Sequence, residues 1–343
     1  MTARNRLGWA DYTFDVITGC RYQCRYCFAK VTTTNMAGDI RWNKAQTDKY
    51  EVDSEGRYTL TEPFMRPSGK QNFWPFGFEP TLHLYRLTNN HASVKLLKGR
   101  GKRIFVGNFS DMFGEWVPDN WIRLVMDAVE MWPKNNYLFM TRNPTRLSQP
   151  GLIVDRKNFW YGTTVTSQED FYRLHELPKL KEARVFVNFS PLIGPVTDDL
   201  KSAFQEKQIS WGIIGEMRGY AMKKIKTERS WVERIASEAE SLGIPVFMMD
   251  SIGDLMGDDF RQEYPPDLEK RELSEEMRCR LEADCFMCGK HGDKREMFSV
   301  GFRPFESHPS AAYIGFVCRD CVNELAVKAG TTVEAVEERV RHK

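Results

Sequence analysis

The stretch from Phe14 to Lys30, FDVITGCRYQCRYCFAK, decides how the rest of the chain is interpreted, because it places Cys20, Cys24 and Cys27 on one short loop. Three thiolates from a single loop can hold three irons of a cubane 4Fe–4S cluster and leave the fourth iron open to another ligand. The competing interpretations are a structural zinc ion and three unrelated thiols. A zinc ion requires a fourth ligand close by, and the acidic and basic side chains around the loop are poor candidates for that role.

The spacing of the loop, C-x3-C-x2-C with the aromatic Tyr26 before the last cysteine, resembles that of the radical S-adenosylmethionine (SAM) enzymes. The resemblance implies that the amino and carboxylate groups of SAM chelate the open iron. It also implies that an electron from the cluster cleaves SAM to a 5′-deoxyadenosyl radical. We therefore expect a 4Fe–4S cluster and SAM as cofactors, and an electron donor such as flavodoxin or ferredoxin as a partner.

Length, charge and cysteine usage limit the class of protein. A chain of 343 residues exceeds one small core, so we expect a large domain with an appendage. The net charge of 49 − 47 = +2 does not favour nucleic acid as partner, because such binding usually needs a more basic domain. Eight cysteines in two groups spaced like metal ligands indicate a reducing cytoplasm. No signal-like or membrane-spanning apolar segment occurs, so we expect neither export nor membrane insertion.

Apolar runs rich in β-branched and aromatic residues alternate with helical patterns along most of the chain. The runs lie at 12–18, 103–107, 137–141, 159–165, 184–189, 209–215 and 245–250. The clearest helical pattern covers 118–132 and opens with Pro118, which suits a first turn. This alternation predicts βαβ units, a parallel sheet and a partial or full β/α barrel, with the chemistry at the carboxyl ends of the strands.

We expect the barrel to occupy residues 1–257, with an insertion at about 31–100. So long a stretch between two strands is more than a loop needs, which indicates a functional segment. Its aromatic residues either cover the cluster and a substrate pocket or pack a small subcore.

Polar residues follow five of the expected strands, at the point where each strand ends. Each one alone is typical of a turn, but five in the same topological position favour a shared pocket. The candidates for holding SAM are Asn108, Ser110, Asp111, Thr164, Asn188 and Ser190. The later strand ends supply Glu216, Arg218 and Asp250, which we expect nearer the substrate.

A closer resemblance is carried by VITGC…CRYCFAK, RIFVGNFSDMFGEWVP, YLFMTRNPTRL, FWYGTTV, VNFSPLIGPV and WGIIGE. Over roughly residues 7–255 this series is similar to the phage Gp37/Gp68 family of radical SAM proteins. Some members of that family are queuine lyases, which break the deazaguanine base queuine down to preQ1, the 7-aminomethyl precursor of queuosine. The sequence departs from the more usual Gly-Gly-Glu after the second strand, where GNFSD stands at 107–111.

Residues 258–343 are expected to form a linker helix and a small metal-binding module. Two C-x2-C pairs lie here: Cys285 with Cys288, and Cys318 with Cys321. Their separation is typical of a zinc ribbon, and a structural zinc can contribute about 10 kcal/mol to folding. An auxiliary 4Fe–4S cluster is the alternative, but C-x2-C knuckles suit tetrahedral zinc. We expect the eighth cysteine, Cys279, to be a small buried residue.

The two resemblances imply a radical SAM lyase that acts on a small deazapurine, with queuine as the specific substrate of a salvage reaction. A carboxylate such as Glu216 or Asp250 suits the amidine edge of a guanine-like base, because it accepts two N–H bonds in one plane. The second hypothesis is modification of RNA or DNA, with the zinc module holding the nucleic acid. The third is a nonenzymatic iron–sulfur and zinc binding module, which leaves the polar strand ends unexplained.

Overall fold

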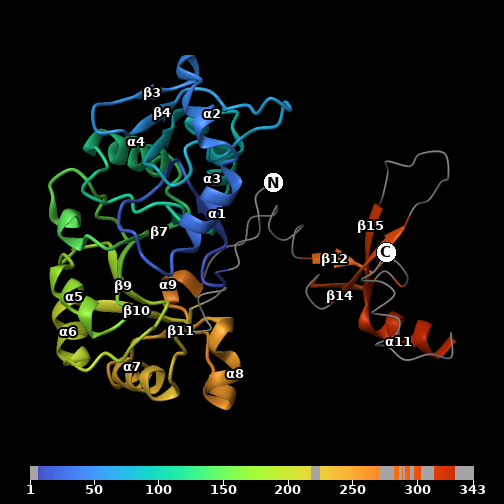
Figure 1. Cartoon of the computed structure of the whole chain (residues 1–343). Helices are drawn as coiled ribbons and strands as arrows, with labels where there is room; N and C mark the ends of the chain where they lie inside the picture. Colours follow the sequence, from blue (N-terminus) through green and yellow to red (C-terminus); the bar gives the residue numbers. More distant parts are fainter. Residues whose placement is uncertain are drawn as a thin grey trace. The chain divides into compact units, whose positions relative to one another are not determined.

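The structure is a computed structural model that describes residues 7–217, 225–269, 282–285, 288, 290–293, 297–302 and 313–328. The chain divides into two compact units, Met1–Glu272 and Leu273–Lys343 (Figure 1). Within the described residues, no helix has the length and apolarity that crossing a membrane requires.

The first unit is built on a seven-stranded sheet in the order β1-β6-β7-β8-β9-β10-β11. All neighbouring strands pair in parallel. The strands are β1 Tyr12–Phe14, β6 Arg103–Val106, β7 Asn136–Thr141, β8 Phe159–Thr164, β9 Arg184–Phe189, β10 Ile209–Ile214 and β11 Val246–Met248. β1 and β11 form the two edges and do not pair with each other in the described residues, so the sheet is open. The α/β prediction is confirmed, in its partial-barrel form.

The expected first strand at 12–18 is divided in two. β1 ends at Phe14, and β2 (Ile17–Thr18) belongs to a separate four-stranded sheet. The break falls at Asp15, whose carboxylate accepts a hydrogen bond from the backbone N–H of Phe109 at 3.0 Å. The chain therefore leaves the barrel sheet just before the cysteine loop.

Helices cover one face of the sheet. Figure 1 shows α4 to α7 following one another along one side of the strands. They are α4 Asp119–Glu130, α5 Tyr172–Glu176, α6 Leu200–Lys207 and α7 Arg229–Ser241. α4 buries Trp121, Val125 and Val129 in the main core that the helices form with the sheet, and Pro118 is its N-cap residue and not part of the first turn.

The opposite face of the sheet carries a second core, the inner-face cluster. It consists of Trp9, Ala10, Phe105, Leu138, Trp160, Phe186, Trp211, Ile213, Phe247, Met249 and Leu268. Alternation along β8 places Trp160 and Gly162 on this face, while Phe159 and Tyr161 join the main core. A Cβ atom at Gly162 would lie 2.6 Å from the ring of Phe186, its partner on β9, so these two positions share one space.

Short elements complete the first unit after β11. They are η6 Asp250–Ile252, α8 Gly253–Met256, η7 Gly257–Asp259 and α9 Pro266–Glu269. Leu268 of α9 is buried in the inner-face cluster, and Trp211 Nε1 donates to the carbonyl oxygen of Glu263 at 3.0 Å. The first unit therefore extends beyond residue 257, where the sequence placed its end.

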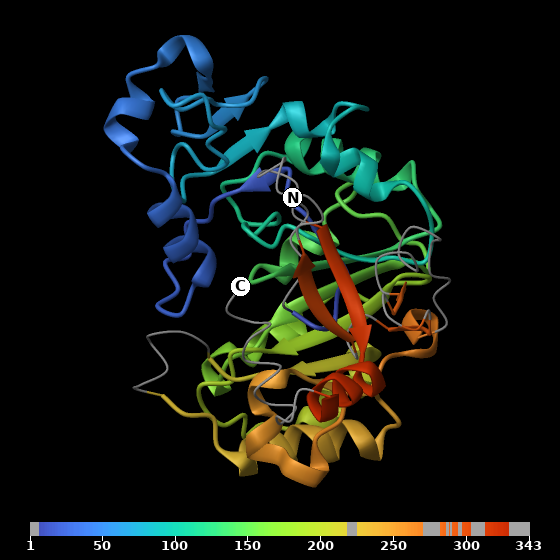
Figure 2. The same ribbon diagram turned by 90° about the vertical axis from the view of Figure 1, so that its right-hand side faces the viewer.

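The insertion forms a small layer of its own, drawn in blue at the upper left of Figure 2. Its elements are α1 Phe28–Met36, α2 Ile40–Lys44, η1 Thr47–Lys49, β3 Glu51–Val52, β4 Tyr58–Leu60, β5 Thr81–His83, η2 Leu84–Leu87 and α3 Ala92–Leu97. The sheet order is β2-β5-β4-β3. Phe76 is fully buried in a separate core with Tyr58 and Phe64, and Trp42 packs against it. Trp42 and Phe76 therefore pack a small subcore of the insertion, which was one of the two alternatives for its aromatic residues.

The second unit contains two antiparallel hairpins and a helix. β12 Glu282–Asp284 pairs with β13 His291–Asp293, and β14 Met297–Phe302 pairs with β15 Tyr313–Cys318. Helix α11 (Arg319–Lys328) follows β15 directly. Cys279 lies outside the described residues.

Candidate functional site

The cysteine loop leaves β2 at the carboxyl edge of the sheet, beside the loop that follows β6. Gly19 forms a parallel bridge with Ser110, and its N–H donates to the carbonyl oxygen of Phe109 at 2.8 Å. The next N–H, that of Cys20, donates to the carbonyl oxygen of Phe78 in the insertion at 3.1 Å. The loop is therefore anchored on one side by the barrel and on the other by the insertion.

Gly19 is required by this double anchorage. Its φ of +90° lies in the left-handed region, where a side chain is strained. A Cβ atom there would also lie 2.3 Å from the carbonyl oxygen of Glu79, a backbone atom that cannot rotate away. Only glycine at position 19 allows the backbone that leads to Cys20 to lie this close to Glu79 of the insertion.

The three cysteines are half-buried and project from successive parts of the loop. The N–H of Cys27 donates to the carbonyl oxygen of Cys24 at 3.2 Å. Cys27 is also the N-cap residue of α1, where its Sγ accepts a hydrogen bond from the N–H of Lys30 at 3.3 Å. Burial raises the pKa of Cys27, and the N–H of Lys30 at the helix N-terminus only partly offsets this rise.

The distances among the three cysteine sulfur atoms distinguish a site for a cluster from a site for a single ion. The described residues contain one group of three Cys, His, Asp or Glu side chains whose ligand atoms all lie within 4.8 Å of one another. This group is Cys285, Cys288 and Cys321 in the second unit. Cys20, Cys24 and Cys27 do not form such a compact group. A cubane cluster binds each cysteine on a different iron, so its thiolates stand farther apart than those on one zinc ion. The N-terminal loop therefore fits a 4Fe–4S cluster.

Burial disfavours ionisation of the Cys20 thiol. Burial raises the pKa of Cys20 to about 12, with smaller contributions from the nearby charges of Asp111, Cys24 and Cys27. Without a metal this thiol stays protonated at neutral pH. Bound metal must displace the proton, because the thiolate is the ligand form.

A buried ionic network lies against the loop. A guanidinium N–H of Arg142 donates to the hydroxyl of Tyr26, and the same side chain pairs with Asp170 at 3.5 Å. Burial alone would lower the pKa of Arg142, but the charges of Tyr26, Cys24 and Asp170 outweigh it and raise this pKa. Asp170 also pairs with Arg173 at 2.7 Å. The network therefore keeps a permanent positive charge beside the cysteines.

The SAM candidates fall at the ends of β6, β8 and β9, as expected, but their side chains have different surroundings. The carboxylate of Asp111 is buried and accepts hydrogen bonds from Thr141 Oγ1 at 2.7 Å, Arg142 N at 2.7 Å and Phe113 N at 3.1 Å. Burial raises the pKa of Asp111, and these hydrogen bonds lower it. Asp111 thus joins the ends of β6 and β7. Its role as a SAM ligand stays a prediction.

Ser110 has a different environment. Its Oγ is buried and has no hydrogen-bond partner among the described residues, although a buried hydroxyl normally has one. Asn108 precedes it in the same turn, and both are partly exposed. The hydroxyl beside the anchored Gly19 is therefore a polar group with capacity for a ligand.

The candidates on β8 and β9 lie further along the same edge. Thr164 is 8% exposed, and its carbonyl oxygen accepts from Arg173 at 3.0 Å. Asn188 is 4% exposed and donates through Nδ2 to the carbonyl oxygen of Ser190 at 3.0 Å. The Oγ of Ser190 would lie 2.8 Å from a Cβ atom at Gly215, so the ends of β9 and β10 are in close contact.

The substrate candidates are only partly brought together. Glu216 follows β10 and is partly buried, and its N–H donates to Ser251 Oγ at 3.2 Å. Asp250 is exposed, and its Oδ1 accepts from Gln262 Nε2 at 2.8 Å. Arg218 lies outside the described residues. Glu216 is therefore partly buried just after β10, while Asp250 is exposed at the next strand end.

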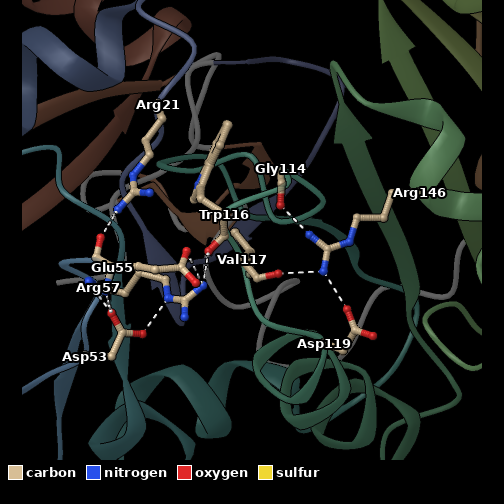
Figure 3. A network of polar contacts seen from close by, with 9 residues as sticks. All are labelled: Arg21, Asp53, Glu55, Arg57, Gly114, Trp116, Val117, Asp119 and Arg146. Carbon is tan, nitrogen blue, oxygen red and sulfur yellow. Dashed lines mark hydrogen bonds and ion pairs between the residues drawn. The ribbon is translucent and has the colours of Figure 1, made fainter.

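Sequence reasoning did not assign roles to the aromatic and basic residues around the loop. The ring of Tyr22 lies 4.8 Å from that of Trp116. Figure 3 shows how the Trp116 segment is fixed: Arg57 donates to the carbonyl oxygen of Trp116 at 3.2 Å, and Arg21 donates to that of Glu55 at 2.6 Å. Arg146 holds the same segment through Gly114 O, Val117 O and Asp119 Oδ1. The one sequence feature that could have indicated a role for any of these residues was the position of Arg142 directly after an expected strand.

The fold and this site define a class of protein: an open parallel β/α barrel with a three-cysteine, cluster-type loop at its carboxyl edge. The chain belongs to the family described as "Protein of unknown function (DUF5131)", whose model matches residues 4–282. No curated protein matches the chain. The resemblance to the phage Gp37/Gp68 family stays a prediction.

Distant structural likenesses exist. A mutant of spore photoproduct lyase with dinucleoside spore photoproduct is 10% identical, with a TM-score of 0.34, and the match covers 99% of this chain and 75% of that chain. Another mutant of that protein, with bound AdoMet and dinucleoside spore photoproduct, is 10% identical, with a TM-score of 0.35 and the same coverage.

Proposed function

We propose that this chain is a radical SAM enzyme and that Cys20, Cys24 and Cys27 hold its 4Fe–4S cluster. The observation that carries the proposal is the cysteine loop itself: three half-buried thiols, too dispersed for one ion, anchored at the carboxyl edge of a parallel barrel. When bound, the cluster supplies the electron that cleaves SAM to a 5′-deoxyadenosyl radical. An external donor such as flavodoxin or ferredoxin provides that electron.

The chain's own residues then have separate tasks. Ser110, with its buried hydroxyl beside Gly19, is positioned to bind a polar group of SAM, and Asn108, Thr164, Asn188 and Ser190 lie along the same edge. Asp111 fixes the ends of β6 and β7 under that site and can also contribute to SAM binding. The guanidinium of Arg142 lies near Cys24, and its positive charge offsets the negative charge of the thiolates.

The inner face of the sheet offers an apolar interior on the amino-terminal side of this edge. The inner-face cluster fills the face of the sheet that carries Trp160 and Trp211, both fully buried. Ionic and hydrogen-bonded contacts are stronger in such an apolar environment than in water.

The substrate we propose is a small deazapurine, with queuine converted to preQ1. Glu216 supports this choice, because a partly buried carboxylate at a late strand end can accept two N–H bonds from a guanine-like edge. Arg218 and Asp250 would complete that region. The aromatic ring of queuine has no easily removed hydrogen, whereas the carbons of its cyclopentenediol do, so the reacting C–H bond lies on the diol side.

The first experiment tests the class of enzyme. Anaerobically reconstituted protein with SAM and dithionite should release 5′-deoxyadenosine, and a Cys20→Ala, Cys24→Ala, Cys27→Ala triple variant should release none. A Cys279→Ala variant is the matched control and should keep the activity. Release by the triple variant would disprove the cluster assignment.

The second experiment tests the substrate. With queuine deuterated only in the cyclopentenediol ring, label should appear in 5′-deoxyadenosine and preQ1 should form. Glu216→Gln should slow preQ1 formation more than it slows SAM cleavage without substrate. Tight, strongly salt-dependent binding of tRNA with no response to free queuine would instead support nucleic acid modification. Absence of preQ1 would refute the queuine assignment and leave the radical SAM assignment intact.

A further inference from the structure

A second group of cysteines, in the second unit, has a geometry that differs from that of the N-terminal loop. The sulfur atoms of Cys285, Cys288 and Cys321 all lie within 4.8 Å of one another. Cys285 Sγ and Cys321 Sγ are 3.7 Å apart, and both residues are buried. This separation is far too long for a disulfide bond, in which the sulfurs are about 2.0 Å apart.

The 3.7 Å separation matches ligands of one tetrahedral ion. With Zn–S bonds of about 2.3 Å, two thiolates on one zinc ion stand about 3.8 Å apart. An auxiliary 4Fe–4S cluster would place each thiolate on its own iron and force the sulfurs farther apart. We propose that the second unit binds a single zinc ion through Cys285, Cys288, Cys321 and a fourth thiolate from Cys318.

The fourth ligand we propose is the first cysteine of the C-x2-C pair that contains Cys321. Cys318 is the last residue of β15, opposite Met297 of β14, and Cys321 lies in the first turn of α11. Both pairs thus have the same C-x2-C spacing, one at the β12–β13 turn and one at a strand-to-helix junction. Four thiolates leave no open position on the ion, which is the arrangement of a structural zinc site and not of a catalytic one.

The surroundings of the group suit a site with two excess negative charges. The N–H of Cys285 donates to the carbonyl oxygen of Lys290 at 2.9 Å and closes the turn that contains Cys288. Lys290 Nζ pairs with Asp320 Oδ2 at 2.8 Å, which joins this turn to the first turn of α11. Cys321 lies in the first turn of α11, so the partial positive charge of this helix N-terminus can offset part of the thiolate charge.

The proposal is tested by metal analysis of the full-length protein, independently of any reaction. Anaerobically reconstituted protein should contain about one zinc per chain besides its iron. Cys321→Ser and Cys318→Ser should lose the zinc, whereas the matched variant Cys279→Ser and the triple variant of the N-terminal loop should keep it. Loss of zinc from Cys279→Ser with retention in Cys318→Ser would overturn the ligand set.

A second measurement avoids dependence on variants that fail to fold. Protein freed of zinc and refilled with cobalt(II) should show the visible bands of a tetrahedral site and the near-ultraviolet bands of cobalt–thiolate bonds. Cys288→His keeps a zinc ligand at the most exposed position, and it should keep the metal while weakening the thiolate bands. About eight irons per chain with no zinc would replace the proposal by a second cluster. Octahedral cobalt bands or no cobalt binding would refute a four-thiolate site.

Discussion

Replacing Gly19 by Ala should damage the cysteine loop far more than the same substitution at Gly38. Both glycines have positive φ, +90° at Gly19 and +72° at Gly38. Left-handed backbone costs an alanine about 1–2 kcal/mol, and a stiffer unfolded chain returns about 0.4–1 kcal/mol. No atom lies within 4 Å of the position that a Cβ atom would take at Gly38, so Gly38→Ala should cost about 0–1.6 kcal/mol.

Gly19→Ala carries an additional steric cost. Its Cβ would lie 2.3 Å from Glu79 O and 2.7 Å from Pro80 N, so the loop itself must move. That movement breaks the hydrogen bonds from Gly19 N to Phe109 O and from Cys20 N to Phe78 O. At about 1–3 kcal/mol for each of these two hydrogen bonds, the total loss is about 2–6 kcal/mol beyond that of Gly38→Ala.

The assay compares thermal unfolding of the metal-free proteins and iron content after identical reconstitution. In a unit of this size each kcal/mol lowers the Tm by about 2–4 °C, so Gly38→Ala should stay within a few degrees of wild type. Gly19→Ala should have a clearly lower Tm and a reduced iron content. Equal Tm shifts and equal iron in the two variants would refute the proposed anchorage of the loop.

Two further predictions concern buried polar groups near the site. Tyr26→Phe removes the hydroxyl that accepts from Arg142 and should lower the free energy of unfolding by about 1 kcal/mol. The control Tyr22→Phe keeps its ring contact with Trp116 and should not lower it. Equal losses in denaturant titrations of the two variants would contradict the contact between Arg142 and Tyr26. Burial lowers the pKa of His83 well below 6.5, so the unfolded chain binds a proton that the folded chain does not, and stability falls as the pH drops below about 6.5. The stability advantage of wild type over His83→Gln should therefore shrink by up to about 1.4 kcal/mol per pH unit below that point, and a constant difference from pH 7 to pH 5 would show that His83 does not titrate this way.

The barrel could be predicted from the sequence because its signal is local. Each strand is a short apolar run, each helix has its own periodicity, and the parallel order follows from their alternation. The same argument places Ser110, Thr164 and Asn188 at one edge of the sheet. The break at Asp15 could not be predicted, because it depends on a hydrogen bond to Phe109, far along the chain.

The surroundings of the site could not be predicted for the same reason. Tyr26 and Arg142 are 116 residues apart in sequence, and nothing in either local pattern indicates that they meet. Asp111 was correctly placed at the end of β6, yet only the fold shows that its carboxylate accepts three hydrogen bonds there. The cysteine spacing indicated metal ligands at both ends of the chain, but the separation of the sulfurs, which distinguishes a cluster from an ion, is a property of the folded chain alone.

The shared space of Gly162 and Phe186 limits how this sequence can diverge. A side chain at position 162 overlaps the ring on the neighbouring strand, so neither position can change size alone without strain or a void. A lineage that enlarges residue 162 must first, or at the same time, shrink residue 186. A substitution that one relative tolerates then damages another relative, so the effect of each mutation depends on the order in which the mutations arise.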